Sequence, residues 1–379
     1  MPAMPNDVPE LLAQLVAIES VNPSLVPGGA GEREVAAFVA AWARDAGLEA
    51  DVLEATPGRP SVVVRAPGAG GGRTLLLCGH LDTVTFEGMA DPRPRVDGDR
   101  LYGRGAYDMK AGVAAALVAC REAAALELAG DVVVAAVADE EHASLGVQEV
   151  LASVHADAAI VTEPTELEVI VAHRGFVWSE IEVTGRAAHG SRPHLGVDAI
   201  VKTGPILTAI GELDAALGER SHRLLGRGSV HASLIRGGEE LSSYPARCTV
   251  GLERRTLPGE TGGDVEAELA SLLAACRAAD PQLQAEQRTL LVREPFEVDD
   301  ASEVVEVVRA AAAGVLGAPP AVGGASYWAD AAFIAAAGIP TVMFGPAGEG
   351  AHAAEEWVSL PSTEAVARTL AAVAARVCA

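Results

Sequence analysis

Carboxylate and imidazole side chains recur in five short motifs between residues 78 and 352. The motifs are Cys78 to Val84, Gly103 to Lys110, Asp139 to His142, Thr162 to Thr165 and Gly350 to His352. Four of them directly follow or interrupt apolar runs that are typical of buried strands. Charged side chains at the ends of buried strands are costly unless something pairs with them. One divalent metal centre would satisfy all five motifs, which indicates a metal-dependent hydrolase.

The first three motifs offer ligands with neighbours that suit them. His80 lies just past a predicted parallel strand, where open α/β sheets bind ligands, and Asp82 points the same way if the chain stays extended. Asp82 can therefore accept the second imidazole N–H of His80. Asp108 opens a predicted helix, which it would cap, and could also bridge two metals. Glu140 and Glu141 are adjacent, so that one can bind metal while the other handles a proton.

The last two motifs complete a set of nitrogen and oxygen ligands. Glu163 ends a third predicted strand, and His352 lies in a loop rich in Gly and Ala. Such ligands suit Zn²⁺, with Co²⁺ or Mn²⁺ as substitutes. A catalytic zinc normally takes fewer protein ligands than this, so the set fits two metals that share a carboxylate, about 3.5–4 Å apart. Water between them would have a pKa of about 7, and a free Glu140 could accept its proton.

Length and composition limit the class of protein. The 379 residues suggest two domains, and the net charge of −24 argues against nucleic acid or an anionic membrane as a partner. The five cysteines form no CxxC pair and suit buried apolar roles in a reducing compartment. Residues 1–8 lack the basic and apolar segments of a signal peptide, so we expect a cytoplasmic location.

Periodicity predicts alternating helices and strands in the N-terminal part. Helices are expected over residues 9–20, 31–47, 108–128 and 145–154. Short apolar runs predict strands over residues 73–78, 132–138 and 158–162. This alternation predicts an α/β fold with a mostly parallel sheet between helices.

The pattern changes near His173 and returns near Pro295. In between, the sequence predicts strands over 177–184, 229–235 and 248–254, and helices over about 197–217 and 264–278. Afterwards it predicts helices over 302–316, over 329–337 and from 362, and a strand over 341–344. We therefore predict a split catalytic domain, residues 1–173 and 291–379. An α+β lid of one antiparallel sheet and two helices, residues 174–290, is inserted in it.

The motifs resemble those of the dizinc amidohydrolases and metallopeptidases that include acetylornithine deacetylase, succinyl-diaminopimelate desuccinylase and bacterial glutamate carboxypeptidase. The resemblance covers essentially the whole chain, through residues 80–84, 103–112, 139–141, 162–165 and 345–352. It implies one zinc bound by His80, Asp108 and Glu163, and another bound by Asp108, Glu141 and His352. It also implies that Glu140 is the general base and that Asp82 is the partner of His80.

The resemblance extends to the predicted lid. Residues 185–193 are similar to a lid motif, in which His189 would polarise the scissile carbonyl, typically across a homodimer formed by the lid. Residues 253–260 are similar to a segment whose arginine binds a substrate carboxylate, which gives that role to Arg255. Ser242 stands where the family often has a substrate-binding Asn, and Tyr327 suggests an aromatic wall at the mouth of the site.

The sequence therefore predicts hydrolysis of an amide bond in an N-acyl amino acid or a related small amide bearing a carboxylate. A dipeptidase or carboxypeptidase of the same family is the alternative, because both activities need the zinc pair and a carboxylate clamp. From another class, a catalytically silent metal-dependent binding protein would keep the ligands. Such a protein has no need of a free carboxylate beside them, whereas this chain has Glu140.

Overall fold

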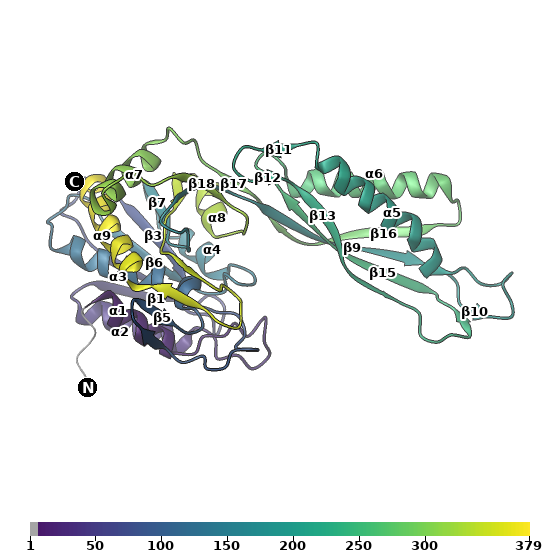
Figure 1. Cartoon of the computed structure of the whole chain (residues 1–379), viewed down its shortest axis with the longest axis horizontal. Helices are drawn as coiled ribbons and strands as arrows, with labels where there is room; N and C mark the ends of the chain where they lie inside the picture. The colour runs from purple at the N-terminus through teal and green to yellow at the C-terminus, as the bar shows by residue number, and fades with distance from the viewer. Residues whose placement is uncertain (1–6) are drawn as a thin grey trace. The chain divides into compact units, whose positions relative to one another are not determined.

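The computed structural model describes residues 7–379, so residues 1–6, on which the signal-peptide expectation partly rests, lie outside the described part. The chain forms two compact units (Figure 1). The first comprises Met1–Val171, Val298–Gly323 and Ala329–Ala379, and the second Ala172–Glu297 and Gly324–Trp328. The domain boundaries predicted from the sequence, after residues 173 and 290, remain predictions.

A mixed sheet forms the centre of the first unit. In spatial order its strands are Glu49–Leu53 (β1), Ser61–Ala66 (β2), Val132–Val137 (β6), Leu75–His80 (β3), Ala158–Val161 (β7), Thr341–Met343 (β19), Val169–His173 (β8) and Phe296–Glu297 (β17). The neighbours β6, β3, β7 and β19 are parallel, whereas β1, β2 and β8 pair antiparallel. Val322–Ala325 (β18) also pairs with β8. The predicted parallel core is confirmed, and the antiparallel β1–β2 pair was not predicted.

Helices flank this sheet, as Figure 1 shows. They are Val8–Ala17 (α1), Arg33–Asp45 (α2), Ala111–Ala124 (α3), Leu145–Leu151 (α4), Glu303–Leu316 (α7), Ala331–Ala336 (α8) and Leu360–Val377 (α9). Helix α3 packs so closely on the sheet that a Cβ atom at Gly112 would lie 2.0 Å from the carbonyl oxygen of Thr162. Small residues on α3 therefore let it approach the strand ends that carry the candidate ligands.

The predicted start of α3 is wrong in one respect. Asp108 lies in the preceding turn Ala106–Lys110 (η1) with φ −113° and ψ 96°, and Lys110 rather than Asp108 is the N-cap residue of α3. The helix begins only at Ala111. The carboxylate of Asp108 is thereby available for other contacts.

A small second sheet in the first unit positions the loop that contains His352. Its order is Gly348–Glu349 (β20), Trp357–Ser359 (β21), Arg100–Tyr102 (β5) and Arg95–Asp97 (β4). His352 lies in the turn between β20 and β21, and β5 leads into the Gly103–Lys110 motif. The pairing of β21 with β5 thus brings two motifs together that are far apart in sequence.

The second unit contains an antiparallel sheet with two helices. The sheet order is Ser229–Gly237 (β13), Arg247–Thr256 (β15), Gly175–Thr184 (β9) and Gln284–Arg293 (β16). Helices Ala199–Leu217 (α5) and Gly262–Ala279 (α6) pack on this sheet over an apolar core. Two short strand pairs complete the unit: Ala188–His189 (β10) with Ser243–Tyr244 (β14), and Ser221–His222 (β11) with Gly226–Arg227 (β12). The predicted antiparallel sheet and helices are confirmed, and β16 was not predicted.

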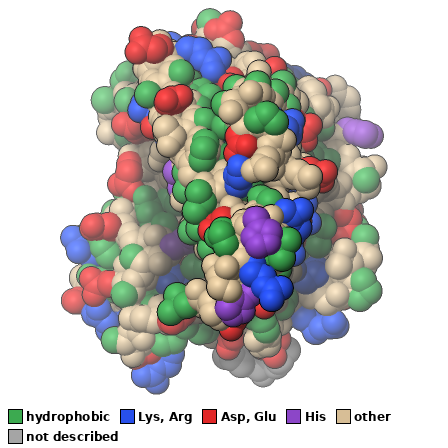
Figure 2. Space-filling view, turned by 90° about the vertical axis from the view of Figure 1, so that its right-hand side faces the viewer, with side chains coloured by type: hydrophobic (Ala, Val, Ile, Leu, Met, Phe, Trp, Pro, Cys, Tyr) green, Lys and Arg blue, Asp and Glu red, His purple; other side chains and the backbone are tan. Residues whose placement is uncertain are grey.

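The surface and the interior fit the composition. Figure 2 shows hydrophobic side chains at the surface, interspersed with acidic, basic and histidine side chains. All five cysteines are buried free thiols, as the sequence analysis predicts. Within residues 7–379, no helix is both long and apolar enough to cross a membrane.

Candidate metal centre

Parallel strands bring the candidate ligands to one edge of the first unit's sheet. His80 is the last residue of β3 and lies opposite Val137, the last residue of β6. Glu140 and Glu141 follow β6 within a few residues, and Glu163 follows β7 in the same way. Because these strands are parallel, their carboxyl ends meet at the edge where open α/β sheets bind ligands.

Asp108 lies between two imidazole rings. Its Oδ1 atom is 3.2 Å from Nε2 of His80, and its Oδ2 atom is 3.3 Å from Nε2 of His352. Nε2 of His352 is also 3.1 Å from Oε2 of Glu141, and Nε2 of His80 is 3.8 Å from Oε1 of Glu163. The structure thus brings together all five predicted ligands, with the two oxygens of one carboxylate directed at two different histidines.

Glu140 belongs to the same cluster. Its Oε2 atom lies 3.8 Å from Nε2 of His80. Ligand atoms of His80, Glu140 and Glu163 lie within 4.8 Å of one another, as do those of His80, Asp108 and Glu141. The first grouping places Glu140 within reach of a metal ion bound by His80.

Burial and mutual repulsion dominate the electrostatics of the cluster. Burial raises the pKa of Glu140 and of Glu163 well above the usual range, and neighbouring carboxylates add to this although His80 opposes it. Burial would also raise the pKa of Asp108, but hydrogen bonds from His352 and His80 hold it below its usual range. Hydrogen bonds to Asp108 and Glu141 raise the pKa of His352 to about 10. A bound cation would stabilise these carboxylates in their charged form.

The donor atoms fit divalent metal ions. They are imidazole nitrogens and carboxylate oxygens, which suit zinc and similar ions. Within the described residues, the Oε1 atom of Glu141 is buried without a hydrogen-bond partner. A buried carboxylate oxygen of this kind is costly unless it is satisfied, and coordination of a cation would satisfy it.

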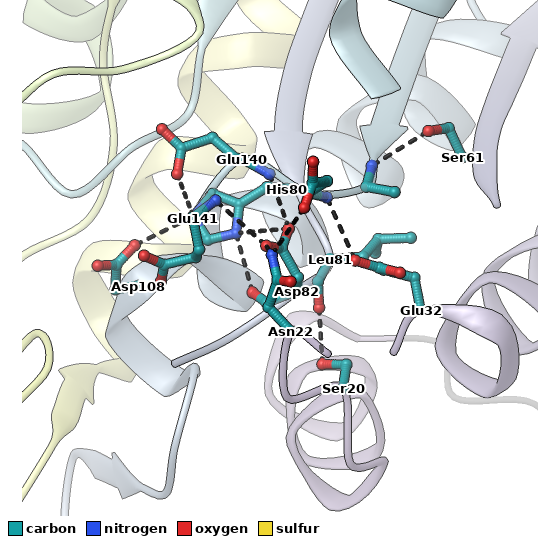
Figure 3. Close-up of polar contacts among 12 residues, drawn as sticks. Ser20, Asn22, Glu32, Ser61, His80, Leu81, Asp82, Asp108, Glu140 and Glu141 are labelled. Atoms are coloured by element: carbon teal, nitrogen blue, oxygen red, sulfur yellow. Dashed lines mark hydrogen bonds and ion pairs between the residues drawn. The ribbon is translucent and has the colours of Figure 1, made fainter. Parts of the chain in front are cut away.

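Asp82 fixes the backbone that carries both glutamates, as Figure 3 shows. Its carboxylate accepts the backbone N–H groups of Glu140 and Glu141 at 3.1 and 3.2 Å and the side-chain amide of Asn22 at 2.8 Å. Nδ1 of His80 lies 2.9 Å from the backbone carbonyl oxygen of Asp82 and 3.7 Å from its Oδ1 atom. The imidazole is therefore oriented mainly by the carbonyl group of Asp82, while the predicted carboxylate contact is the longer one.

A cluster of buried polar side chains contacts Asp82 through Asn22, and the sequence analysis did not predict it. Asn22 also donates to Oδ1 of Asp139 at 3.0 Å, and Arg59 contacts Asp139 at 2.7 Å and Glu32 at 2.6 Å. Asp139 has a positive φ of 68°, which a non-glycine residue rarely adopts. These contacts fix the turn that follows β6. Only the segment Ser20 to Pro23 offered a sequence signal, because its polar residues interrupt an apolar run.

The other predicted site residues belong to the second unit. His189 is exposed, with Nδ1 2.8 Å from Oγ of Ser191, and it pairs with Ser243 where β10 meets β14. Gly190 donates its N–H to the carbonyl oxygen of Ser242, so His189 and Ser242 lie close together. Tyr327 is 38% exposed.

Two adjacent arginines of the second unit differ in environment. Arg254 is buried and contacts Glu260 at 2.9 Å and Glu268 at 3.3 Å. Arg255 is only partly buried, with its guanidinium 5.2 Å from the ring centre of Phe176 and its Nε atom 2.8 Å from Glu253. Arg254 is therefore committed to internal contacts, whereas part of Arg255 is accessible.

Comparison with known proteins identifies the family. The model of the peptidase family M20/M25/M40 matches residues 76–376, which is most of the chain. The chain belongs to this family. Members are metal-dependent hydrolases of amide bonds, and the clustered ligands agree with that class.

Curated relatives are similar over most of the chain. The acetylornithine deacetylase of Proteus mirabilis is 29% identical over 369 residues, which cover 94% of this chain and 92% of that protein. The acetylornithine deacetylase of Vibrio campbellii is 32% identical over 284 residues, covering 73% of this chain and 74% of that protein. These similarities agree with an enzyme of the M20/M25/M40 family.

Solved structures share the fold over nearly the whole chain. The aminopeptidase PepT of Bacillus cereus has a TM-score of 0.78 at 20% identity, with 98% of both chains covered. A dinuclear metal-binding peptidase of the M20 family from Bacillus subtilis has a TM-score of 0.72 at 16% identity, with 98% and 97% covered. The predicted α/β fold with a separate antiparallel sheet is thereby confirmed.

Proposed function

We propose that the chain is a dizinc deacylase, which hydrolyses the amide bond of an N-acyl amino acid or a related small amide. The observation that carries this proposal is the position of Asp108, whose two oxygens face His80 and His352. A carboxylate in that position suits two cations that share one ligand. The similarity to acetylornithine deacetylases supports an acylated amino acid as the substrate class.

The proposed ligands divide into two sets around Asp108. One zinc ion would be bound by His80, Asp108 and Glu163, and the other by Asp108, Glu141 and His352. Contacts of 3.1–3.8 Å among these donor atoms support the division. Co²⁺ and Mn²⁺ accept the same donors and are the expected substitutes.

Glu140 is the proposed general base. When bound, the cations supply Lewis acidity, which polarises a carbonyl group and makes nearby water more acidic. Glu140 would accept a proton from the attacking water and deliver it to the nitrogen of the leaving amine. Asp82 would keep the carboxylate of Glu140 in position, because it binds the backbone N–H of the same residue.

The second unit would supply substrate contacts. His189 is exposed and can donate a hydrogen bond to the scissile carbonyl oxygen, a contact worth about 2.7–4 kcal/mol in the transition state. The accessible guanidinium of Arg255 suits a substrate carboxylate, which arginine binds bidentately. Ser242 and Tyr327 are the further proposed substrate contacts.

A homodimer through the second unit is part of the proposal. Strand β13 lies at the edge of its sheet and exposes Leu234 and Ile235 by 57% and 55%. Helix α5 exposes Ile200 and Val201 by 43% and 69%. An exposed apolar edge strand tends to pair with another chain. Ile235→Lys should therefore convert a dimer into a monomer in sedimentation velocity, and a monomeric wild-type protein would contradict this part.

The location is proposed to be the cytoplasm. Five buried free thiols suit a reducing compartment, in which disulfides are rare. Fractionation of cells that express the chain would test this proposal.

Glu140→Gln tests the chemistry directly. The variant should bind two Zn²⁺ ions like the wild type but lose activity by a factor of about 10²–10⁴, because the amide cannot accept a proton. Metal content is measured beside the release of free amine. Loss of one metal together with activity would show that Glu140 is a ligand. Glu355→Gln, at an exposed position, is the matched control.

A substrate panel tests the reaction class. Release of free amine is measured from N-acetyl, N-succinyl and N-aromatic-acyl amino acids and from dipeptides, with Zn²⁺ or Co²⁺ and with a chelated control. Metal-dependent cleavage of N-acyl amino acids would support the deacylase. Preference for dipeptides would support the alternative of a dipeptidase or carboxypeptidase, and no cleavage with both metals bound would contradict the proposal.

A further inference from the structure

A buried carboxylate beside the metal centre accepts four hydrogen bonds. Glu356 precedes β21 and is buried. Its Oε1 atom accepts the backbone N–H groups of Tyr107 at 2.9 Å and Asp108 at 3.1 Å. Its Oε2 atom accepts the backbone N–H of Gly105 at 3.1 Å and Nη1 of Arg104 at 2.7 Å. The side chain of Glu356 therefore binds the turn that contains Asp108.

Arg104 links this turn to two other segments. Its Nη2 atom donates to the carbonyl oxygen of Ala353 at 2.8 Å, next to His352 in the chain. Its Nε atom donates to the carbonyl oxygen of Thr85 at 3.0 Å, in the segment that follows β3. Like Glu356, Arg104 is buried. The pair thus joins the backbone near Asp108 to the loop that contains His352.

The two residues depend on each other chemically. All four partners of Glu356 are donors, and they divide equally between its two oxygens. A glutamine could accept hydrogen bonds at only one end, and its NH₂ group would oppose donors at the other. Removal of either partner would leave a buried charge uncompensated, which is strongly unfavourable.

The two ligands beside this pair are not fixed by the central sheet. Asp108 lies in the non-helical turn before α3, and His352 has a positive φ of 62° with a side chain that is 54% exposed. By contrast, His80 is the last residue of β3, and Glu163 lies two residues after the end of β7 and is buried. Asp108 and His352 therefore need another means of orientation, and Glu356 with Arg104 provides it.

We propose that Glu356, acting through Arg104, is a positioning residue that aligns Asp108 with His352 as ligands of the same metal ion. The inference rests on the proposed dinuclear function. Its consequence is that the metal site formed with His352 depends on Glu356 more strongly than the site formed with Glu163.

Titration of metal into chelator-treated protein tests this inference. Zn²⁺ is added to wild type and to Glu356→Gln in a calorimeter, and the absorption of Co²⁺ reports the coordination of each ion. One of the two binding events should weaken by about 10–100-fold, the usual effect of losing a residue that orients a ligand. The other event, which shares Asp108 but keeps His80 and Glu163 at the ends of sheet strands, should weaken clearly less than the first, and circular dichroism should remain that of the wild type.

Two further variants keep the test decisive. Glu355→Gln makes the same change at the neighbouring exposed position and should leave both events unchanged. Arg104→Lys keeps the charge but cannot reach Glu356 and both carbonyl groups together. It should weaken the same binding event, and it takes the place of Glu356→Gln if that variant does not fold.

The outcomes separate this inference from the proposed function. A wild type that binds two ions, with a Glu356→Gln variant that binds both equally tightly, would overturn the positioning role alone. Equal weakening of both events would show a general effect and would also overturn it. A wild type that binds fewer than two ions would overturn the dinuclear function together with this inference.

Discussion

The two units differ in how they bury charge. In the first unit, Arg59 lies in the interior beside Glu32 and Asp139, all of them less than a tenth exposed. In the second unit, the core between sheet and helices is a cluster of apolar side chains. Ion pairs such as Arg288 with Glu180 lie on its surface, where Arg288 is 68% exposed.

The difference indicates that buried charges in the first unit position the candidate site, whereas the core of the second unit mainly stabilises the fold. Buried ion pairs rarely stabilise a protein more than apolar residues of the same size would. Stability therefore does not explain why the first unit buries these charges. Their role is to fix the turn that carries Glu140 and Glu141. The second unit also buries Arg254, which contacts Glu260 and Glu268, but the core between its sheet and its helices follows ordinary apolar packing.

The largest loss of stability is expected for Arg59→Ala in the first unit. It leaves Glu32 and Asp139 buried without their cation, which should cost about 3–5 kcal/mol of the free energy of unfolding. Urea unfolding followed by amide exchange in β3 and β6 measures the loss in the first unit. Arg288→Ala is the control on the surface of the second unit, and a loss below about 1 kcal/mol for Arg59→Ala would contradict the distinction.

Leu273→Ala tests the apolar interior of the second unit. Leu273 is fully buried in α6, so the cavity should cost about 2–5 kcal/mol, as large-to-small changes in cores do. Amide exchange in β9 and β15 should accelerate, while the bound metal content stays at the wild-type value.

The exposed Leu241 provides the control for this change, because Leu241→Ala removes the same atoms from the surface. It should shift stability by less than about 0.5 kcal/mol. Loss of metal in Leu273→Ala would show that the second unit's core supports the metal centre, which is the opposite of the expected result.

Helices and strands with a clear hydrophobic pattern were predicted from the sequence, and those without one were missed. Strands such as β3 and β6 are continuous apolar runs covered on both faces, so their pattern was clear. Strand β16 is mostly polar and partly exposed, and β1 is exposed along much of its length. Strands of this kind are defined by their pairing partners, which local sequence does not reveal.

The sequence predicted the side chains that cluster at the candidate metal centre, whereas it did not predict the buried residues that contact them. His80 ends one apolar strand, and Glu141 and Glu163 follow two others, a position that is typical of ligands at the edge of a sheet. Asn22 and Glu356 act through contacts with residues 60 and 248 positions away in sequence. Only the three-dimensional structure brings such partners together. The cap assigned to Asp108 was wrong because α3 begins only at Ala111, with Lys110 as its N-cap residue.

Acid should affect the surface of the second unit in a predictable direction. Hydrogen bonds from Arg227 and from the backbone of Val230 hold the pKa of Asp214 below its ordinary value of 3.8. A depressed pKa contributes stability above the unfolded pKa, and that contribution is lost as the pH falls through the folded value. The wild type should therefore exceed Asp214→Asn in stability at pH 6, and the difference should shrink near pH 3.

Thermal unfolding at the two pH values measures this difference. Glu219→Gln removes an exposed carboxylate from the same unit and serves as the control. A gap between wild type and Asp214→Asn that widens at pH 3 would have the wrong sign for a depressed pKa.

The smallest effect is expected for the surface pair of Arg288 and Glu180. Their side chains are 3.0 Å apart but 68% and 24% exposed, so water competes for both charges. A double-mutant cycle with Ala at both positions should give a coupling energy of about 0.2–1 kcal/mol. Because salt screens exposed charges, 1 M sodium chloride should remove most of that coupling.

The same double-mutant cycle on Arg59 and Glu32 compares the coupling energy of a buried ion pair directly with that of the surface pair. Both partners are less than a tenth exposed, so bulk salt should change their coupling little. Replacing both by Ala should cost less than the sum of the single changes, because the double variant leaves neither of the two charges buried without the other. If the buried pair were as weak and as salt-sensitive as the surface pair, the interior of the first unit would be effectively hydrated. Its arginine would then have no positioning role.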